Sequence, residues 1–254
     1  MKTKSIIFLA LMMILSLASC RKSLFINGNK NISTQTRELE PFSKLANNGS
    51  FEVTIIKDTL SFVIIEAESN LIPHILCTID NDALIIDSQE TMNSHRSMKL
   101  EVHTPSLQAM ELKGSGKIDF ETFTADHFSA VVDGSGNING SVICDDAYLA
   151  IKGSGNLSLG LATESLVASI EGSGDLRIAG ESLDSKLEIY GSGDISDYDF
   201  VHYDCEVISD GSGSIYTSVI NSLKIIIEGS GSVHYKGNPF LQSVINGSGS
   251  VVKH

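Results

Sequence analysis

Residues 153–176 read GSGNLSLGLATESLVASIEGSGDL, and this stretch holds one full period of the repeat that decides the fold. The tripeptide Gly-Ser-Gly occurs eight times in the C-terminal part of the chain, at intervals of 20, 19, 19, 19, 20, 18 and 18 residues. A near-constant period of this length is typical of a repeat architecture. The glycines that we expect to form structural turns are Gly114, Gly116, Gly134, Gly136, Gly153, Gly155, Gly172, Gly174, Gly191, Gly193, Gly211, Gly213, Gly229, Gly231, Gly247 and Gly249.

Apolar residues recur at fixed distances from each triplet. The residue four positions after the first glycine is aliphatic in every repeat, and the residues two and four positions before it are mostly apolar. Alternation at period two on both sides of a glycine corner indicates a strand, a tight turn and a second strand. The aliphatic column consists of Ile118, Ile138, Leu157, Leu176, Ile195, Ile215, Val233 and Val251.

A repeat of about 19 residues cannot close a core of its own, so its apolar face must be covered by the neighbouring repeats. Strands of successive repeats would then pair in parallel and in register at roughly 4.8 Å. The sequence therefore predicts an all-β protein, a right-handed parallel β-helix or solenoid, because parallel crossovers favour that hand. A propeller is the alternative, but its blades need about twice this period.

A polar residue follows almost every triplet. Seven of the eight residues in this column are Asn, Asp or Ser, the exception being Lys117. These side chains can hydrogen-bond their own backbone at a corner, so we interpret the column as turn chemistry. A cation bound between Asp175 and Asp194, which would stack one repeat apart, is the alternative hypothesis.

The N-terminus has the pattern of an export signal. Lys2 and Lys4 precede an apolar run over residues 6–17, and small residues lead to Cys20. The run is too short to span a membrane. Residues 1–20 therefore resemble a bacterial lipoprotein signal, with Cys20 as the lipidated first residue of the mature chain. Plain cleavage is the alternative. Arg21 favours the outer membrane as the destination, and the sequence leaves open whether the protein faces the periplasm or the cell surface.

The remaining chain divides into a short tether and one β domain. Residues 21–36 are polar and are predicted to be the tether, and residues 37–254 form a single solenoid domain. Within it, 37–105 show irregular short strands that cap the solenoid, and 106–254 hold the regular rungs. Asn48-Gly49-Ser50 resembles a degenerate corner. A separate small sandwich is the alternative for the irregular part.

Charge and cysteine content narrow the function classes. The net charge is −13, and removal of residues 1–20, which carry two lysines and no acid, leaves −15. An acidic chain without a basic patch argues against nucleic-acid binding. Cys77, Cys144 and Cys205 remain after Cys20; their odd number argues against a disulfide framework and for isolated buried thiols.

The mature chain resembles a known family over roughly residues 38–253. The matching segments are Glu40–Leu45, Gly49–Ile55, Asn81–Ile86, Thr104–Leu107 and the Gly-Ser-Gly array that ends in GSVHYKGNP at residues 231–239. They are similar to the DUF2807 family, described as an auto-transporter adhesin head, or GIN, domain. This resemblance implies a β-helix-like fold, an exported lipoprotein context and a role in adhesion, and it brings no catalytic residues.

No catalytic constellation stands out in the sequence. The histidines occupy no common column, and neither metal-ligand spacing nor a nucleophile–base pair is evident. We therefore predict a protein without enzymatic activity or cofactor that binds glycans or matrix proteins. A periplasm-facing scaffold and a polysaccharide-active enzyme are the alternatives. Tyrosines that could contact sugar rings, or simply pack on the sheet, are Tyr190, Tyr198, Tyr203, Tyr216 and Tyr235.

The last half repeat carries a further expectation. Residues 250–254 follow the final triplet and complete only one strand. A strand in this position presents an open edge, which is suited to self-association.

Overall fold

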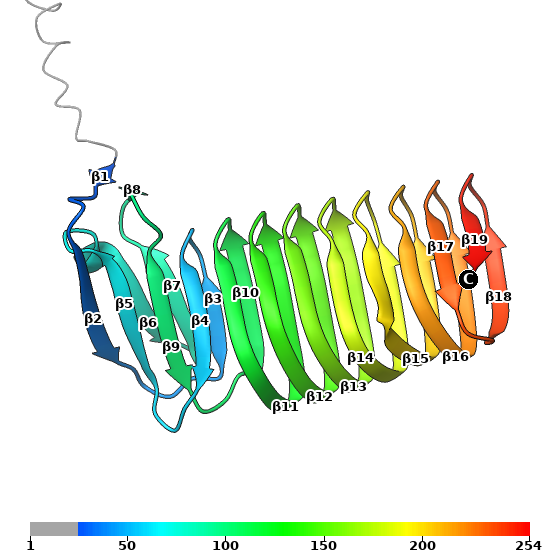
Figure 1. Cartoon of the computed structure of the whole chain (residues 1–254), viewed down its shortest axis with the longest axis horizontal. Helices are drawn as coiled ribbons and strands as arrows, with labels where there is room; N and C mark the ends of the chain where they lie inside the picture. Colours follow the sequence, from blue (N-terminus) through cyan, green and yellow to red (C-terminus); the bar gives the residue numbers. More distant parts are fainter. Residues whose placement is uncertain (1–24) are drawn as a thin grey trace, which may run out of the picture.

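The computed structural model describes residues 25–254 and shows a β-solenoid of about eight turns with irregular strands at its N-terminal end (Figure 1). The predicted signal peptide, Cys20 and the first residues of the predicted tether lie outside the described residues. The predicted solenoid is thereby confirmed. The strands of the regular part are β10 (Ala109–Gly114), β11 (Lys117–Gly134), β12 (Asn137–Gly153), β13 (Asn156–Gly172), β14 (Leu176–Ile189), β15 (Ile195–Ser209), β16 (Ile215–Ile227), β17 (Ser232–Lys236), β18 (Phe240–Ile245) and β19 (Ser250–Lys253).

Each long strand from β11 to β16 bends midway, so that one rung contributes to two facing sheets (Figure 1). We call sheet 1 the halves that follow a triplet and sheet 2 the halves that precede the next triplet. Successive rungs pair in parallel, with Leu157 opposite Leu176 in sheet 1 and Ile170 opposite Ile189 in sheet 2. The predicted aliphatic column lies inside, because its members from Ile118 to Val233 are at most 1% exposed.

The glycine corners are held by one repeated hydrogen-bond pattern. The carbonyl oxygen of Gly153 accepts the backbone N–H of Ser173 at 2.8 Å and that of Gly174 at 3.1 Å. The same pattern joins every other pair of successive triplets in the array. The corner therefore binds each rung to the next through two amides on one carbonyl.

Two different constraints require glycine at these corners. The first glycine has a φ between +102° and +145° only in the first four triplets, Gly114 to Gly172. Elsewhere the constraint is the approach of the backbones: a Cβ on Gly174 would lie 1.9 Å from the carbonyl oxygen of Gly155. A non-glycine residue at these positions would push the rungs apart.

The polar column after the triplets also joins rungs. Asn156 Oδ1 accepts the N–H of Asp175 at 3.1 Å, Asp175 Oδ1 accepts that of Asp194 at 3.3 Å, and Asp194 Oδ1 accepts that of Ser214 at 2.7 Å. These side chains hydrogen-bond backbone groups at the corner. The N–H groups that they accept belong to the next rung, whereas the turn interpretation places them in the same rung. The carboxylates of Asp175 and Asp194, which form the hypothetical cation site, thus each accept a backbone hydrogen bond. Within residues 25–254 no group of three or more His, Cys, Asp or Glu side chains is arranged to hold a metal ion.

The N-terminal strands extend both sheets. β3 pairs in parallel with β10, and β4 with β11; Lys117 N–H donates to the carbonyl of Phe51 at 3.0 Å, so Asn48-Gly49-Ser50 stacks beneath the first triplet. A single hydrophobic core runs through both regions, which argues against a separate sandwich. The elements are β1 (Ile26–Asn27), β2 (Ile32–Glu38), β3 (Lys44–Asn47), β4 (Glu52–Lys57), β5 (Phe62–Glu68), η1 (Ile72–His74), β6 (Ile75–Asp80), β7 (Ala83–Ser88), β8 (Met92–Asn93) and β9 (Lys99–Thr104).

The predicted tether over 21–36 is too long. β2 begins at Ile32 and pairs antiparallel with all of β5. Its side chains are mostly exposed, which explains why the segment resembles a linker in the sequence. The backbone hydrogen bonds of β2 nevertheless cover an edge of β5 that would otherwise be open. At the other end of the solenoid, every residue of β18 is exposed.

Glu68 at the end of β5 organises the N-terminal end. Its side chain is fully buried and accepts hydrogen bonds from the backbone of Lys30 at 2.5 Å, the backbone of His95 at 2.9 Å and the hydroxyl of Ser94 at 2.8 Å. Burial raises the pKa of this carboxyl, but the hydrogen bonds from His95, Ser94 and Lys30 outweigh burial and lower the pKa to about 2. The ionised carboxylate therefore ties two loops to β5.

We expect Gly174→Ala to lower the free energy of unfolding by about 2 kcal/mol or more, because its Cβ would collide with the backbone of the preceding rung. The exposed neighbour Ser173→Ala should change it by less than about 0.5 kcal/mol. Denaturant unfolding of both variants tests this. Equal losses would show that the corner is not closely packed.

Glu68→Gln should remove a pH dependence of stability. Since the pKa of Glu68 is lower in the folded state than the ordinary 4.5, the carboxylate stabilises the fold above pH 4.5, and this contribution is lost as the pH falls toward about 2. The difference in melting temperature between wild type and Glu68→Gln should therefore shrink steadily on acidification. A difference independent of pH over this range would contradict the assignment.

Candidate functional site

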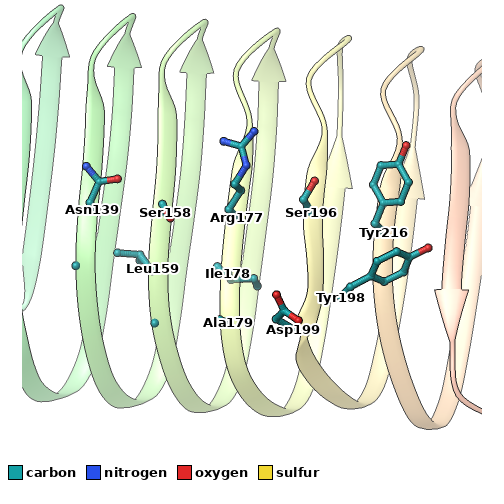
Figure 2. Close-up of a pocket in the computed structure, with 12 residues that line it drawn as sticks. Asn139, Ser158, Leu159, Arg177, Ile178, Ala179, Ser196, Tyr198, Asp199 and Tyr216 are labelled. Carbon is teal, nitrogen blue, oxygen red and sulfur yellow. The ribbon is translucent and has the colours of Figure 1, made fainter.

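The outer surface of sheet 1 carries a groove of about 720 Å³ that crosses β12 to β16 (Figure 2). Ring, cationic and acidic side chains of several rungs converge in this hollow. Its lining residues are Asn139, Gly140, Ser158, Leu159, Gly160, Arg177, Ile178, Ala179, Ser196, Tyr198, Asp199 and Tyr216.

Small outward-facing residues create the hollow. Ser158, Arg177 and Ser196 lie opposite one another on β13, β14 and β15, so they form one outward column. Gly160 and Ala179 form the neighbouring column on β13 and β14. Because four of these five residues are small, the sheet surface is left uncovered around the longer side chain of Arg177.

Ring side chains form the C-terminal wall of the groove. The ring of Tyr216 stacks on that of His234 with centroids 4.9 Å apart, and Tyr198 packs edge-on against Tyr216 at 5.6 Å. His254 continues the cluster 5.2 Å from His234. Lys236 Nζ lies 4.1 Å from the centroid of the Tyr198 ring, which is a favourable cation–π distance. The cluster fixes both tyrosines beside the groove.

The groove offers both charges to a ligand. The side chain of Arg177 is 58% exposed and donates to Asp175 Oδ2 at 3.1 Å, which restrains the guanidinium on the corner side of the groove. Arg177 is the only arginine after Arg96 in the sequence. Asp199 is exposed at the lower side of the groove (Figure 2). The groove thus places fixed donors and acceptors beside aromatic surface.

A register shift in β15 explains how the site arises. Arg177 pairs with Ser196, but Ala179 pairs with Asp199, so β15 contains one extra residue between them. A bulge of this kind redirects side chains. Asp197 keeps the inward position of its counterpart Ile178, whereas Tyr198 and Asp199 both face outward and line the groove before the chain turns inward again at Phe200. The 20-residue interval between Gly191 and Gly211 is the feature of the sequence that could have revealed this bulge.

The bulge also creates a buried polar network. His202 Nε2 lies 2.9 Å from Asp197 Oδ2, and His202 Nδ1 lies 2.6 Å from Ser185 Oγ. Asp197 and His202 are fully buried and Ser185 is 8% exposed. The expectation that the chain has no nucleophile–base pair is therefore wrong; residues far apart in the sequence become neighbours because strands stack across rungs.

This network lacks the access that catalysis needs. A serine nucleophile must meet a substrate carbonyl beside oxyanion donors, whereas these three side chains lie inside the solenoid. Burial raises the pKa of Asp197, and His202 counteracts this only in part. The network is suited to holding the bulge in place.

The other predicted site residues are dispersed. Of the five tyrosines, only Tyr198 and Tyr216 come together; Tyr190 and Tyr203 are exposed outside the groove lining, and Tyr235 is buried. Cys144 and Cys205 are buried and Cys77 is half-buried, and all three are free, as predicted. No helix within residues 25–254 is long and apolar enough to cross a membrane.

Solved structures share this architecture. A protein described as a "putative adhesin" from Parabacteroides merdae ATCC 43184 superposes with a TM-score of 0.81 at 20% identity, covering 91% of this chain and 99% of that one. A "putative lipid binding protein" from Parabacteroides distasonis ATCC 8503 gives 0.79 at 22% identity, with 91% and 99% covered. A "putative adhesin" from Bacteroides fragilis NCTC 9343 gives 0.71 at 20% identity, with 90% and 100% covered. These likenesses show the fold.

The chain is thus a β-solenoid of the kind found in bacterial proteins described as adhesins. The family model described as "Putative auto-transporter adhesin, head GIN domain" matches residues 41–239, and the chain belongs to this family, DUF2807. No curated protein matches the chain.

The buried network yields a stability prediction. Asp197→Ala should lower the free energy of unfolding by about 1–3 kcal/mol, because it leaves His202 Nε2 buried without its partner. Asp197→Asn should cost less, since an amide oxygen can accept the same hydrogen bond and no charge is buried. Asp199→Ala, on the exposed side of the bulge, is the matched control. Equal losses in all three variants would contradict a supporting role for the network.

Proposed function

We propose that this protein is a non-catalytic, adhesin-type binding module of the bacterial cell envelope, anchored through lipid on Cys20, that binds glycans in the groove of sheet 1. The observation that carries the proposal is the convergence of Tyr216, Tyr198, Arg177 and Asp199 on one groove of about 720 Å³. The membership of the chain in a family described by adhesion supports the general class.

The chemistry of the groove suits saccharides. Sugar rings present apolar C–H faces that pack on aromatic rings, and hydroxyls that both donate and accept hydrogen bonds. Tyr216 and Tyr198 supply the aromatic surface, Arg177 donates, and Asp199 accepts. The groove is open, so each contact is expected to be weak, and dense presentation of the module would strengthen attachment.

The proposed anchor places the groove away from the membrane. β1, whose first residue Ile26 follows Cys20 by six positions, lies at the N-terminal end of the solenoid, whereas the groove crosses β12 to β16 further along its axis (Figure 1). An anchor on Cys20 would hold the β1 end near the lipid. Whether the module faces outward or into the periplasm decides between an adhesin and a scaffold. Protease shaving of intact cells measures this directly.

A hydrolase is the second candidate, because Ser185, His202 and Asp197 adopt the order of a nucleophile, a base and an orienting acid. Their burial argues against it. We expect a fluorophosphonate probe to leave Ser185 unlabelled in the folded protein. Labelling at Ser185 that a Ser185→Ala variant abolishes, or release of reducing sugar from a polysaccharide panel, would favour the enzyme.

The lipid-free domain tethered densely on beads should retain at least one polysaccharide of a broad panel more strongly than the monomer binds it in solution. Tyr216→Ala should weaken this retention by roughly tenfold, since loss of one aromatic contact is multiplied over many sites. Tyr190→Ala removes an exposed tyrosine outside the groove and is the matched control. Absence of retention for the whole panel, together with protease protection in cells, would favour the scaffold.

A further inference from the structure

The outward column in the centre of the groove contains one gap. Arg177 on β14 pairs with Ser196 on β15, Ser196 pairs with Tyr216 on β16, and Tyr216 pairs with His234 on β17. A large planar group therefore stands at three of these four successive positions. At Ser196 the side chain is a single hydroxymethyl group, and the space above it belongs to the groove (Figure 2).

The spacing of this column fits one ring into the gap. The centroids of Tyr216 and His234, which are neighbours in the column, are 4.9 Å apart. Adjacent strands are about 4.8 Å apart, so Arg177 and Tyr216 flank Ser196 at a separation of roughly 9.6 Å. A ring centred over Ser196 would lie at contact distance from the Tyr216 ring on one side and from the guanidinium on the other.

Neighbouring side chains leave this space open. Tyr198 comes from the same strand as Ser196, but its ring is directed toward β16, where it contacts Tyr216 and His254 (Figure 2). The guanidinium of Arg177 is restrained by Asp175. The other small residue of the column, Ser158, lies between Asn139 and Arg177 and has no ring beside it. In this column, Ser196 is thus the small residue that has an arginine on one side and an aromatic ring on the other.

We propose that the space over Ser196 binds one pyranose ring of a glycan, held between Arg177 and Tyr216. This inference rests on the proposed glycan-binding function and specifies its central contact. A pyranose fits better than an aromatic side chain of a peptide, because the gap is surrounded by Arg177, Asp199 and the Ser196 hydroxyl. Hydroxyl groups satisfy such donors and acceptors, whereas an apolar ring would desolvate them without replacement.

Filling the gap provides the test. Ser196→Tyr supplies the missing ring of the column and should occupy the sugar position without disturbing the core, because residue 196 points outward. Ser169→Tyr makes the same change at an outward, half-buried position of sheet 2 and is the matched control. Binding is measured by saturation-transfer difference NMR with methyl pyranosides of glucose, galactose, mannose and N-acetylglucosamine. N-acetyl-L-tyrosinamide is included as the aromatic probe.

At least one methyl pyranoside should receive saturation from the wild type and from Ser169→Tyr, and Ser196→Tyr should lower its affinity at least tenfold. Tyr216→Ala should reduce the transfer to the ring C–H protons. An unchanged affinity in Ser196→Tyr would overturn the assignment of the gap while leaving glycan binding intact. If only the tyrosinamide binds, and Ser196→Tyr abolishes this binding, the ligand of the gap would be an aromatic side chain of a peptide and not a sugar. Absence of transfer to every probe would overturn the inference, and the bead assay then decides separately whether the proposed function also fails.

Discussion

The structure depends on how closely the backbones approach at the Gly-Ser-Gly corners. One glycine carbonyl accepts two amides of the next rung, as Gly153 does from Ser173 and Gly174. This contact leaves no space for a Cβ on the second glycine of the triplet, such as Gly174. Each corner sets the distance and the register of the following rung. This spacing determines the aliphatic columns, the hydrogen-bonded column of Asn, Asp and Ser residues, and the outward columns. Side chains at equivalent positions therefore meet their counterparts at a fixed spacing along the axis.

Much of this architecture could be predicted because every repeat of the sequence is subject to the same physical constraints. Leu157 and Ile170 have counterparts at equivalent positions in the other periods, so one interpretation applies to successive rungs. The inward columns are confirmed up to β17, whereas Ile245 in the last rung is exposed. The tether boundary was wrong because β2 is stabilised by backbone pairing with β5, which leaves little trace in side-chain pattern. Likewise, the restriction of positive φ to the first four triplets depends on small changes in corner geometry that identical tripeptides do not reveal.

The candidate site could not be predicted in the same way, since it lies where the repeat deviates. Alignment on the glycines treats residues 197–199 as an ordinary part of a rung, although the extra residue leaves both Tyr198 and Asp199 on the outer surface and turns His202 inward. The pairing of His202 with Ser185 crosses 17 positions in sequence and depends on this local shift. Tyr216 could be singled out by residue type, but its position beside a gap required the register of β14 to β17. Deviations in the interval between triplets are therefore more informative about function than the triplets themselves.

The bulge in β15 also bears on how such proteins can diversify. Each rung contacts only its two neighbours, so an inserted residue disturbs a short section of the stack and leaves distant rungs unchanged. In this chain the pairing of β15 with β16 is irregular between Ser196 and Asp204 and runs without a further shift from the pair Asp204–Ser222 to the pair Ser209–Ile227. The extra residue thus brings His202 inward to Asp197 and leaves Tyr198 and Asp199 together on the outer surface. A lineage of solenoids could acquire new recognition surfaces by single-codon insertions, each absorbed within one rung, without redesigning the core that keeps the molecule folded.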